Sequence, residues 1–184
     1  MSDTVGAISK KRVYTGRIVS LDVDTVRFPN GTIGDLEMLR HSGASAVIPF
    51  LDDRSGADPG ILLIRQYRYA TEGEIYEIPA GRLDKGEDPK ACAERELREE
   101  TGYSAVNVEH LTTFYTTPGF TDEKIHIFAA DAVNPGSSAL EADEIVELAP
   151  MPFSQALEMV RQGRIVDGKT IIALLFAARY RKIG

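Results

Sequence analysis

The sequence predicts a mixed α/β protein of the α+β kind, with an N-terminal β appendage ahead of the main domain. Three observations support this fold class. Short apolar or alternating runs, which are typical of strands, dominate the chain up to about residue 130. A helix with capping residues at both ends interrupts these runs after residue 87. Two further helical patterns follow near the C-terminus.

Turn residues separate the expected strands. Asn30-Gly31 is a hairpin signal, because both residue types tolerate a positive φ. We place the boundary near Gly43, with residues 1–42 as the appendage and residues 43–184 as the main domain. The expected strands are residues 13–21, 23–28 and 32–39 in the appendage, and residues 46–51, 61–66, 74–79, 106–115, 124–130 and 145–148 in the main domain.

Three helices are expected, at residues 88–101, 154–162 and 169–181. In the first, Asp88 is a suitable N-cap, and Pro89 occupies the first helical position, where its missing N–H costs nothing. Gly102 ends this helix and Gly163 ends the second. Apolar residues recur at helical spacing along the third helix, as expected of a helix that packs on a core.

Composition narrows the class of protein. With 184 residues, the chain can bury a full core. Because it lacks an apolar run of membrane-spanning length and an apolar secretory signal, we expect a cytoplasmic protein with no membrane contact. The single cysteine, Cys92, excludes an intrachain disulfide and is interpreted as a small helix residue, not a nucleophile. The net charge of −7 argues against a nucleic-acid binder.

The first helix carries the residues with the most chemical content. At about 100° per residue, Glu96 and Glu100 lie about 40° apart, and Glu99 lies about 60° from Glu96 on the other side. Like charges at this spacing destabilise a helix unless a cation lies among them, and Mg²⁺ or Mn²⁺ prefers such carboxylate oxygens. Ala93 and Leu97 lie on a different face, suited to the core. The alternative is a solvated acidic helix face.

Residues 81–103 resemble the Nudix box, G-x5-E-x7-R-E-U-x-E-E-x-G-U, in which U is a bulky apolar residue. The matching residues are Gly81, Glu87, Arg95, Glu96, Leu97, Glu99, Glu100, Gly102 and Tyr103. Only Tyr103 departs from the pattern, since an aliphatic residue is usual there. The strand order around the box also resembles the family's αβα sandwich with a mixed central sheet. The resemblance implies a hydrolase that cuts the pyrophosphate bond of a nucleoside diphosphate linked to a second group.

The same resemblance implies the metal ligands. Glu96 and Glu100 match the main ligands, and Glu99 matches a supporting ligand or a residue that holds the ligands without touching the metal. Glu99 is also a candidate catalytic residue. The residue before the box glycine, Ala80, supplies a backbone carbonyl to a metal in related enzymes. Two or three Mg²⁺ ions are implied, with Mn²⁺ as a possible substitute.

Two further box positions are expected to shape the loop. Glu87 and Arg95 match a pair that ties the loop to the helix. We interpret Arg95 mainly as structural, and it stays a candidate for catalysis. Gly81 is expected to serve backbone shape, through the wide φ range of glycine.

The general base is expected outside the box. In ADP-ribose hydrolases of the family it comes from a mobile loop after the box, and residues 140–145 are the acidic segment in that place. Glu141 is the first candidate and Glu144 the second. A merely solvated acidic loop is the alternative. The preceding residues 135–138 would give the loop freedom to close.

Three segments resemble ADP-ribose pyrophosphatases of the family. Pro118 lies 15 residues after the box. The other two segments, RQYRYA (residues 65–70) and YEIPAG (residues 76–81), come before the box helix. The expected substrate is therefore ADP-ribose or a related nucleoside diphosphate sugar. Two alternatives stay open, namely a broad-range hydrolase acting on GDP-mannose or dinucleotides, and a non-catalytic nucleotide-sugar sensor. Pro118-Gly119 could also be plain turn chemistry.

Several residues are candidates for binding this substrate. Arg68 could grip a phosphate bidentately or stack on adenine, and Arg65 is the weaker choice. Glu77 matches a position near the ribose or a metal-bound water. Phe28 or Tyr14 could stack on the base, with a core or interface role as the alternative. The appendage resembles the part that related enzymes use for a swapped homodimer.

Overall fold

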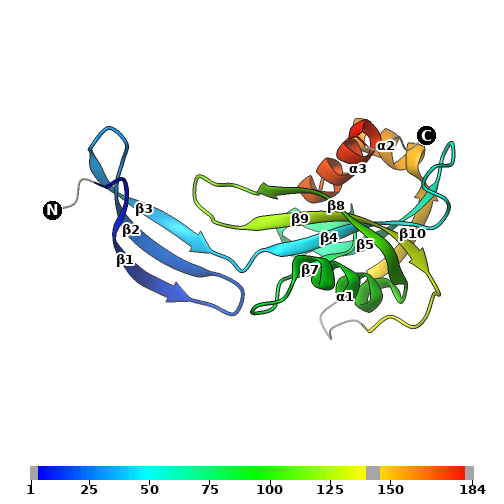
Figure 1. Cartoon of the computed structure of the whole chain (residues 1–184), viewed down its shortest axis with the longest axis horizontal. Coiled ribbons are helices and arrows are strands. Elements are labelled where there is room, and N and C mark those ends of the chain that lie inside the picture. The colour runs from blue at the N-terminus through cyan, green and yellow to red at the C-terminus, as the bar shows by residue number, and fades with distance from the viewer. Residues whose placement is uncertain (1–3, 140–145, 181–184) are drawn as a thin grey trace. The chain divides into compact units, whose positions relative to one another are not determined.

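The computed structural model describes residues 4–139 and 146–180 and divides into two compact units. The first unit combines Met1–Gly43 with Phe114–Lys124, and the second combines Ala44–Thr113 with Ile125–Gly184. The turn between the two longest strands of the main domain therefore groups with the N-terminal segment. Figure 1 shows the strands of each unit.

The first unit is built on an antiparallel sheet of three strands in the order β1-β2-β3. The strands are β1 (Gly6–Thr15), β2 (Ser20–Arg27) and β3 (Ile33–Arg40). The expected strand at residues 13–21 is wrong, because the chain reverses direction inside it. Gly16 N–H donates to the Val19 carbonyl at 2.9 Å, which closes a tight turn between β1 and β2. At the second turn only Gly31, and not Asn30, has a positive φ.

The second unit contains a seven-stranded sheet with the central order β10-β5-β4-β9-β8. Strands β4 and β9 run parallel, whereas β5 runs antiparallel to both β4 and β10, so the sheet is mixed as expected. The short strand β7 was not expected from the sequence. The strands are β4 (Ala44–Phe50), β5 (Gly60–Arg68), β6 (Gly73–Glu77), β7 (Ala80–Arg82), β8 (Ser104–Tyr115), β9 (Lys124–Val133) and β10 (Val146–Pro152).

Helices cover both faces of this sheet. Helix α1 packs against β4 and β7 on one face, and α2 and α3 lie on the other face (Figure 1). The αβα sandwich is confirmed. The helices are α1 (Pro89–Thr101), α2 (Phe153–Arg161) and α3 (Gly168–Tyr180), with a 3-10 turn, η1 (Tyr69–Thr71), after β5. Within residues 4–139 and 146–180, no helix combines the length and apolar character needed to cross a membrane.

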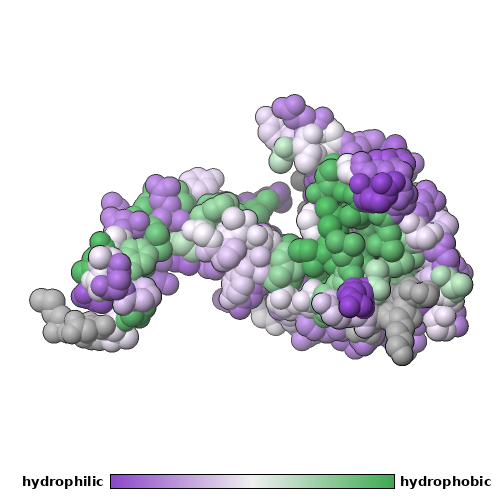
Figure 2. Space-filling view, turned by 90° about the horizontal axis from the view of Figure 1, so that it is seen from above, coloured by the Kyte–Doolittle hydropathy of each residue, from purple (hydrophilic) through white to green (hydrophobic). Residues whose placement is uncertain are grey.

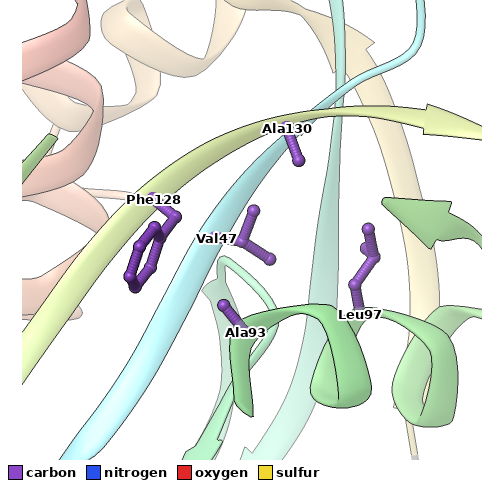
Figure 3. Close-up of a cluster of buried hydrophobic side chains, with 5 residues drawn as sticks. All are labelled: Val47, Ala93, Leu97, Phe128 and Ala130. Atoms are coloured by element: carbon purple, nitrogen blue, oxygen red, sulfur yellow. The ribbon is translucent and has the colours of Figure 1, made fainter. Parts of the chain in front are cut away.

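A cluster of buried apolar side chains fixes the rotation of α1 on the sheet. Ala93 and Leu97 project from the helix toward Val47 of β4 and toward Phe128 and Ala130 of β9 (Figure 3). Both helix residues are fully buried, as their spacing predicted. Because Ala93 and Leu97 pack on this core, the rotation of α1 is fixed, and with it the positions of its acidic residues.

Candidate active site

Local signals set both ends of helix α1. The Asp88 side chain accepts hydrogen bonds from two backbone N–H groups of the first turn, at 2.9 and 3.2 Å, and Pro89 follows it. At the other end Gly102 has a φ of 79°, and its N–H donates to the Arg98 carbonyl at 2.9 Å. The predicted start and end of the helix are confirmed.

Two carboxylates of α1 are nearly buried against strand β7. Glu96 is 8% exposed and Glu100 is 3% exposed. The Ala80 N–H donates to Oε2 of Glu100 at 3.0 Å. A Cβ atom at Gly81 would overlap the carboxylate of Glu96. Gly81 does not have a positive φ, so its role differs from the one expected: glycine is needed here for close approach, not for an unusual backbone angle.

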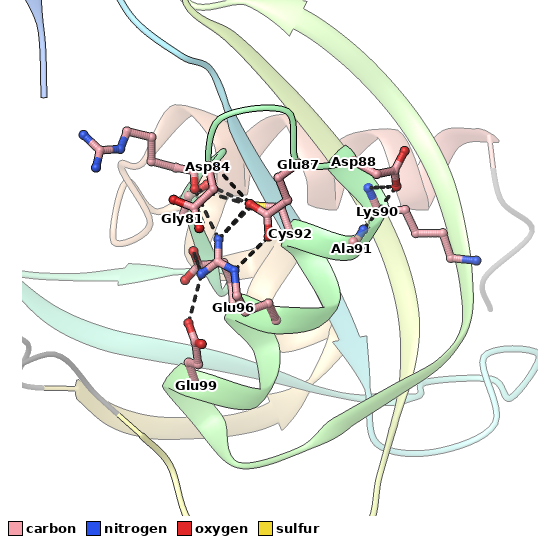
Figure 4. A network of polar contacts seen from close by, with 11 residues as sticks. Gly81, Asp84, Glu87, Asp88, Lys90, Ala91, Cys92, Glu96 and Glu99 are labelled. Carbon is pink, nitrogen blue, oxygen red and sulfur yellow. Dashed lines mark hydrogen bonds and ion pairs between the residues drawn. The ribbon is translucent and has the colours of Figure 1, made fainter.

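Arg95 connects the loop to the acidic face of the helix through hydrogen bonds. Figure 4 shows the polar network that contains Glu87, Glu96 and Glu99. Its Nε and Nη2 atoms donate to the two oxygens of Glu87 at 2.9 and 3.0 Å. Its Nη1 atom donates to Glu96 at 2.6 Å and to Glu99 at 2.9 Å. One guanidinium therefore serves three carboxylates, and the hydrogen bonds from Arg95 lower the pKa of Glu87 to about 2.

The Glu87–Arg95 pair gives a testable pH dependence of stability. The folded pKa of Glu87 lies below its ordinary value of 4.5, so the pair stabilises the protein fully above about pH 4.5 and loses this effect as the pH falls toward 2. Relative to Glu87→Gln, the wild type should have a free energy of unfolding higher by about 1–2 kcal/mol at pH 7. Urea unfolding at pH 7, 4.5 and 3 should show this difference shrinking, and a constant difference would contradict the assignment.

The charges of this cluster suit a divalent cation. Three carboxylates, from Glu87, Glu96 and Glu99, share the single guanidinium of Arg95, and Glu100 adds a fourth on the same helix; Glu96 and Glu100 are nearly buried. Buried negative charge is costly unless it is paired, and hard oxygen donors are the ligands that Mg²⁺ and Mn²⁺ prefer.

The carboxylates are nevertheless held by different partners. Glu96 and Glu99 meet at Arg95, whereas Glu100 accepts from the Ala80 N–H. Within the part of the chain that the structure describes, no three acidic, histidine or cysteine side chains form a preformed metal-binding group. The helix thus supplies the ligand types along one face without drawing them together.

Arg68 and Glu77 form a second polar group in the same unit. Arg68 donates from Nε to Oε1 of Glu77 at 2.6 Å and from Nη2 to Oε2 at 3.1 Å, which is a bidentate pair. Glu77 is 2% exposed, whereas the Arg68 side chain is 41% exposed. Burial alone would raise the pKa of Glu77, but hydrogen bonds from Arg68 and the charge of Lys169 outweigh it and hold the pKa below its ordinary value.

The first turn of helix α3 also belongs to this polar group. The sequence alone did not identify its residues as part of the site. Lys169 Nζ makes an ion pair with Glu77 and lies 3.1 Å from Oδ2 of Asp167. Asp167 also accepts from the Thr170 N–H at 3.0 Å, as an N-cap does. The Ile78 N–H donates to the Thr170 hydroxyl at 2.9 Å, which joins α3 to the segment before Ala80. Asp167, three residues before Thr170, is a helix-capping signal that the sequence shows. The sequence does not show that Lys169 pairs with Glu77.

The remaining box and flanking residues have ordinary surroundings. Arg65 lies 3.2 Å from Glu74 and 2.6 Å from Glu147, in exposed ion pairs. Cys92 is buried, and desolvation raises the pKa of its thiol to about 12. A thiol with so high a pKa is a poor nucleophile.

The proposed base loop begins beside α1. The Gly136 N–H donates to the Gly102 carbonyl at 2.9 Å, and the Ala139 N–H donates to the Glu99 carbonyl at 2.8 Å. These bonds hold the chain up to residue 139 against the last turn of the helix. The two candidate bases, Glu141 and Glu144, lie outside the described residues.

Pro118, Gly119 and Phe28 belong to the first unit. Pro118 and Gly119 lie in a turn that is bonded to the end of β3, where Leu39 N–H donates to the Phe120 carbonyl at 2.8 Å. Phe28 lies at the opposite end of β3, with its ring over Gly34. At about 3.3 Å per residue, the length of β3 separates them by roughly 20 Å.

Each unit also has a hollow. In the first unit a cavity of about 400 Å³ lies beside the Pro118 turn, and Leu39, His41 and Phe120 are among its lining residues. In the second unit a hollow of about 520 Å³ lies at the end of β4, but its Arg54 is already paired with Asp131. The second hollow is at the far end of β4 from Ala46, the residue that pairs with Ala80.

Comparisons with known proteins agree with this geometry. A family model described as the NUDIX domain matches residues 40–173. The chain is 42% identical to a methanol dehydrogenase activator of Bacillus methanolicus and 39% identical to an ADP-ribose pyrophosphatase of Bacillus subtilis, covering 92% of this chain and 90% of each relative. The crystal structure of an ADP compounds hydrolase shares the fold, with a TM-score of 0.81 at 22% identity over 97% of this chain and 95% of that one.

Proposed function

The chain belongs to the Nudix hydrolase family, and from this we propose that it hydrolyses the pyrophosphate bond of ADP-ribose or a related nucleoside diphosphate sugar. It is a pyrophosphatase of that family. The proposed products are a nucleoside monophosphate and a sugar phosphate. The 39% identity to an ADP-ribose pyrophosphatase over 92% of the chain supports this substrate class.

One structural observation carries the proposal. Two nearly buried carboxylates, Glu96 and Glu100, lie against the backbone of Ala80 and Gly81. Arg68 is a partly exposed cation held by the buried carboxylate of Glu77, whose hydrogen bond is the main reason that the pKa of Arg68 is raised. Acidic ligands for cations and a fixed guanidinium are what binding a diphosphate requires.

The proposed roles follow from these positions. Glu96, Glu100 and the Ala80 carbonyl would hold two or three Mg²⁺ ions, with Glu99 as a supporting ligand and Mn²⁺ as a substitute. Bound divalent cations neutralise the charge of the diphosphate and make an attacking water more nucleophilic. Arg68 would bind one phosphate of the substrate.

A general base must accept the proton of the attacking water. We propose Glu141 for this role and Glu144 as the second candidate. The hydrogen bond from the Ala139 N–H to the Glu99 carbonyl supports this choice. It holds the residue just before the acidic segment against helix α1, which carries the proposed metal ligands. A comparison of kcat for Glu141→Gln and Glu144→Gln decides between them.

A substrate panel tests the proposed function. Purified protein with Mg²⁺ is given ADP-ribose, GDP-mannose, UDP-glucose, NADH or a nucleoside triphosphate, and phosphatase-coupled phosphate release is measured. Faster turnover of ADP-ribose than of the other compounds is expected. Equal rates on all nucleotide sugars would favour the broad-range alternative. Binding of ADP-ribose without turnover would favour the sensor alternative.

We also propose a cytoplasmic homodimer that exchanges its N-terminal β segments. Phe28 and Pro118 lie roughly 20 Å apart at opposite ends of β3, and an exchange of N-terminal segments would bring these two candidate contacts to one nucleotide from two protomers. Large apolar side chains of β1 are exposed, among them Val13 and Tyr14. Figure 2 shows a broad apolar area on the second unit. Leu175 is among the exposed large apolar residues of that unit. A solution mass near the 20.2 kDa of one chain would contradict the dimer.

A further inference from the structure

Lys169 is a nearly buried cation that the proposed chemistry does not use. Its side chain is 12% exposed and lies in the first turn of α3. Its Nζ pairs with Oε2 of Glu77 and lies 3.1 Å from Asp167. A lysine is rarely this buried unless it is paired, so these two contacts account for its position.

Lys169 and Arg68 share one carboxylate group. Arg68 donates from Nε to Oε1 of Glu77 at 2.6 Å and from Nη2 to Oε2 at 3.1 Å. Lys169 pairs with the same Oε2 oxygen. Lys169 therefore fixes the plane of the Glu77 carboxylate, and that plane fixes the guanidinium of Arg68. Helix α3 is itself held in place, because Thr170 accepts from the Ile78 N–H at 2.9 Å.

The charges of the group explain why a second cation is needed. Arg68 and Lys169 carry two positive charges, and Glu77 and Asp167 carry two negative charges. Without Lys169, Arg68 would face two carboxylates alone, and the group would be net negative toward an anionic substrate. Lys169 thus balances one of the two carboxylates, so that the group around Arg68, its most exposed member, is neutral and not net negative.

We propose that Lys169 is a positioning residue for substrate binding, which holds Glu77 so that Glu77 presents Arg68 to a phosphate of the nucleoside diphosphate sugar. The inference rests on the proposed function and deepens it. Lys169 does not itself touch the reacting atoms. Its effect should therefore appear in KM and not in kcat.

The test compares Lys169→Met and Lys169→Arg with the wild type. For Lys169→Met we expect a rise in KM for ADP-ribose of about tenfold, with kcat within about threefold. Lys169→Arg, which keeps the charge, should restore KM to within about threefold of the wild type. Arg161→Met is the matched control, because Arg161 pairs with Glu158 in a largely exposed ion pair, and its KM should not change. Lys169→Gln replaces the Met variant if circular dichroism shows that the latter does not fold.

A second readout does not depend on activity. The Nε–H resonance of Arg68 in ¹H–¹⁵N spectra of the substrate-free protein should shift or broaden in Lys169→Met and stay in place in Lys169→Arg. An unchanged KM, or an unmoved Arg68 resonance, overturns the inference, even if the variant melts at a lower temperature. If the wild type turns over no nucleotide sugar, the proposed function fails, and the resonance alone decides whether Lys169 positions Arg68.

Discussion

Glu100→Gln is expected to lower kcat by about a thousandfold or more while the fold survives. The glutamine amide keeps an oxygen that can accept the Ala80 N–H, which Oε2 of Glu100 accepts at 3.0 Å, so the hydrogen bond to the backbone survives the substitution. The negative charge is lost, however, and an amide oxygen is a much weaker ligand for a hard cation. We therefore expect kcat to fall and the free energy of unfolding to stay nearly unchanged.

Glu94→Gln provides the matched control on the same helix. Glu94 is half-exposed, and its ion pair with Lys90 is 4.0 Å long, so its replacement should leave kcat unchanged. Initial rates at saturating substrate and Mg²⁺, with circular dichroism of each variant, make the comparison. Activity of Glu100→Gln within tenfold of the wild type would refute Glu100 as a metal ligand.

Gly81→Ala is expected to lower kcat by about a hundredfold with little loss of stability. A Cβ atom at this position would overlap the carboxylate of Glu96. The carboxylate is the end of a flexible side chain, so it can move aside without disturbing the core. That movement carries Glu96 away from the metal site, and the apparent affinity for Mg²⁺ should fall as well.

A double-mutant cycle identifies the cause of the effect. If Gly81→Ala acts through Glu96, it should add nothing to Glu96→Gln, and the double variant should be no slower than Glu96→Gln alone. Gly73→Ala is the control, because the nearest atom to its new Cβ would be 3.8 Å away, an ordinary contact. Additive losses in the cycle would show that Gly81 serves the fold in another way.

The sequence predicted well the features whose causes are local. Helix α1 begins after Asp88 and ends at Gly102 because each end is fixed by neighbouring residues. Its core face follows from the spacing of Ala93 and Leu97. The αβα architecture could be predicted from the order of the elements and from the family resemblance. Neither depends on the exact residue at which a strand or helix begins or ends.

Features that depend on distant contacts could not be predicted in this way. The turn at Gly16 falls inside a run that reads as one strand, because its apolar residues continue through the bend. The reason for Gly81 lies in Glu96, fifteen positions away, and no local pattern shows that approach. Lys169 gave no signal beyond helix propensity, since its partner Glu77 is brought to it only by the packing of α3.

The parallel pairing of β4 with β9 also bears on how the chain folds. Val47 completes its core only when Phe128 and Ala130 arrive from β9, so the central sheet closes a very long loop. Such non-local pairing is slow, because loop-closure entropy is lost before the contacts form. During synthesis, β4 and β5 would be exposed, with unpaired apolar edges, until β9 leaves the ribosome. Hydrogen exchange during refolding should therefore show β4 gaining protection late, together with β9.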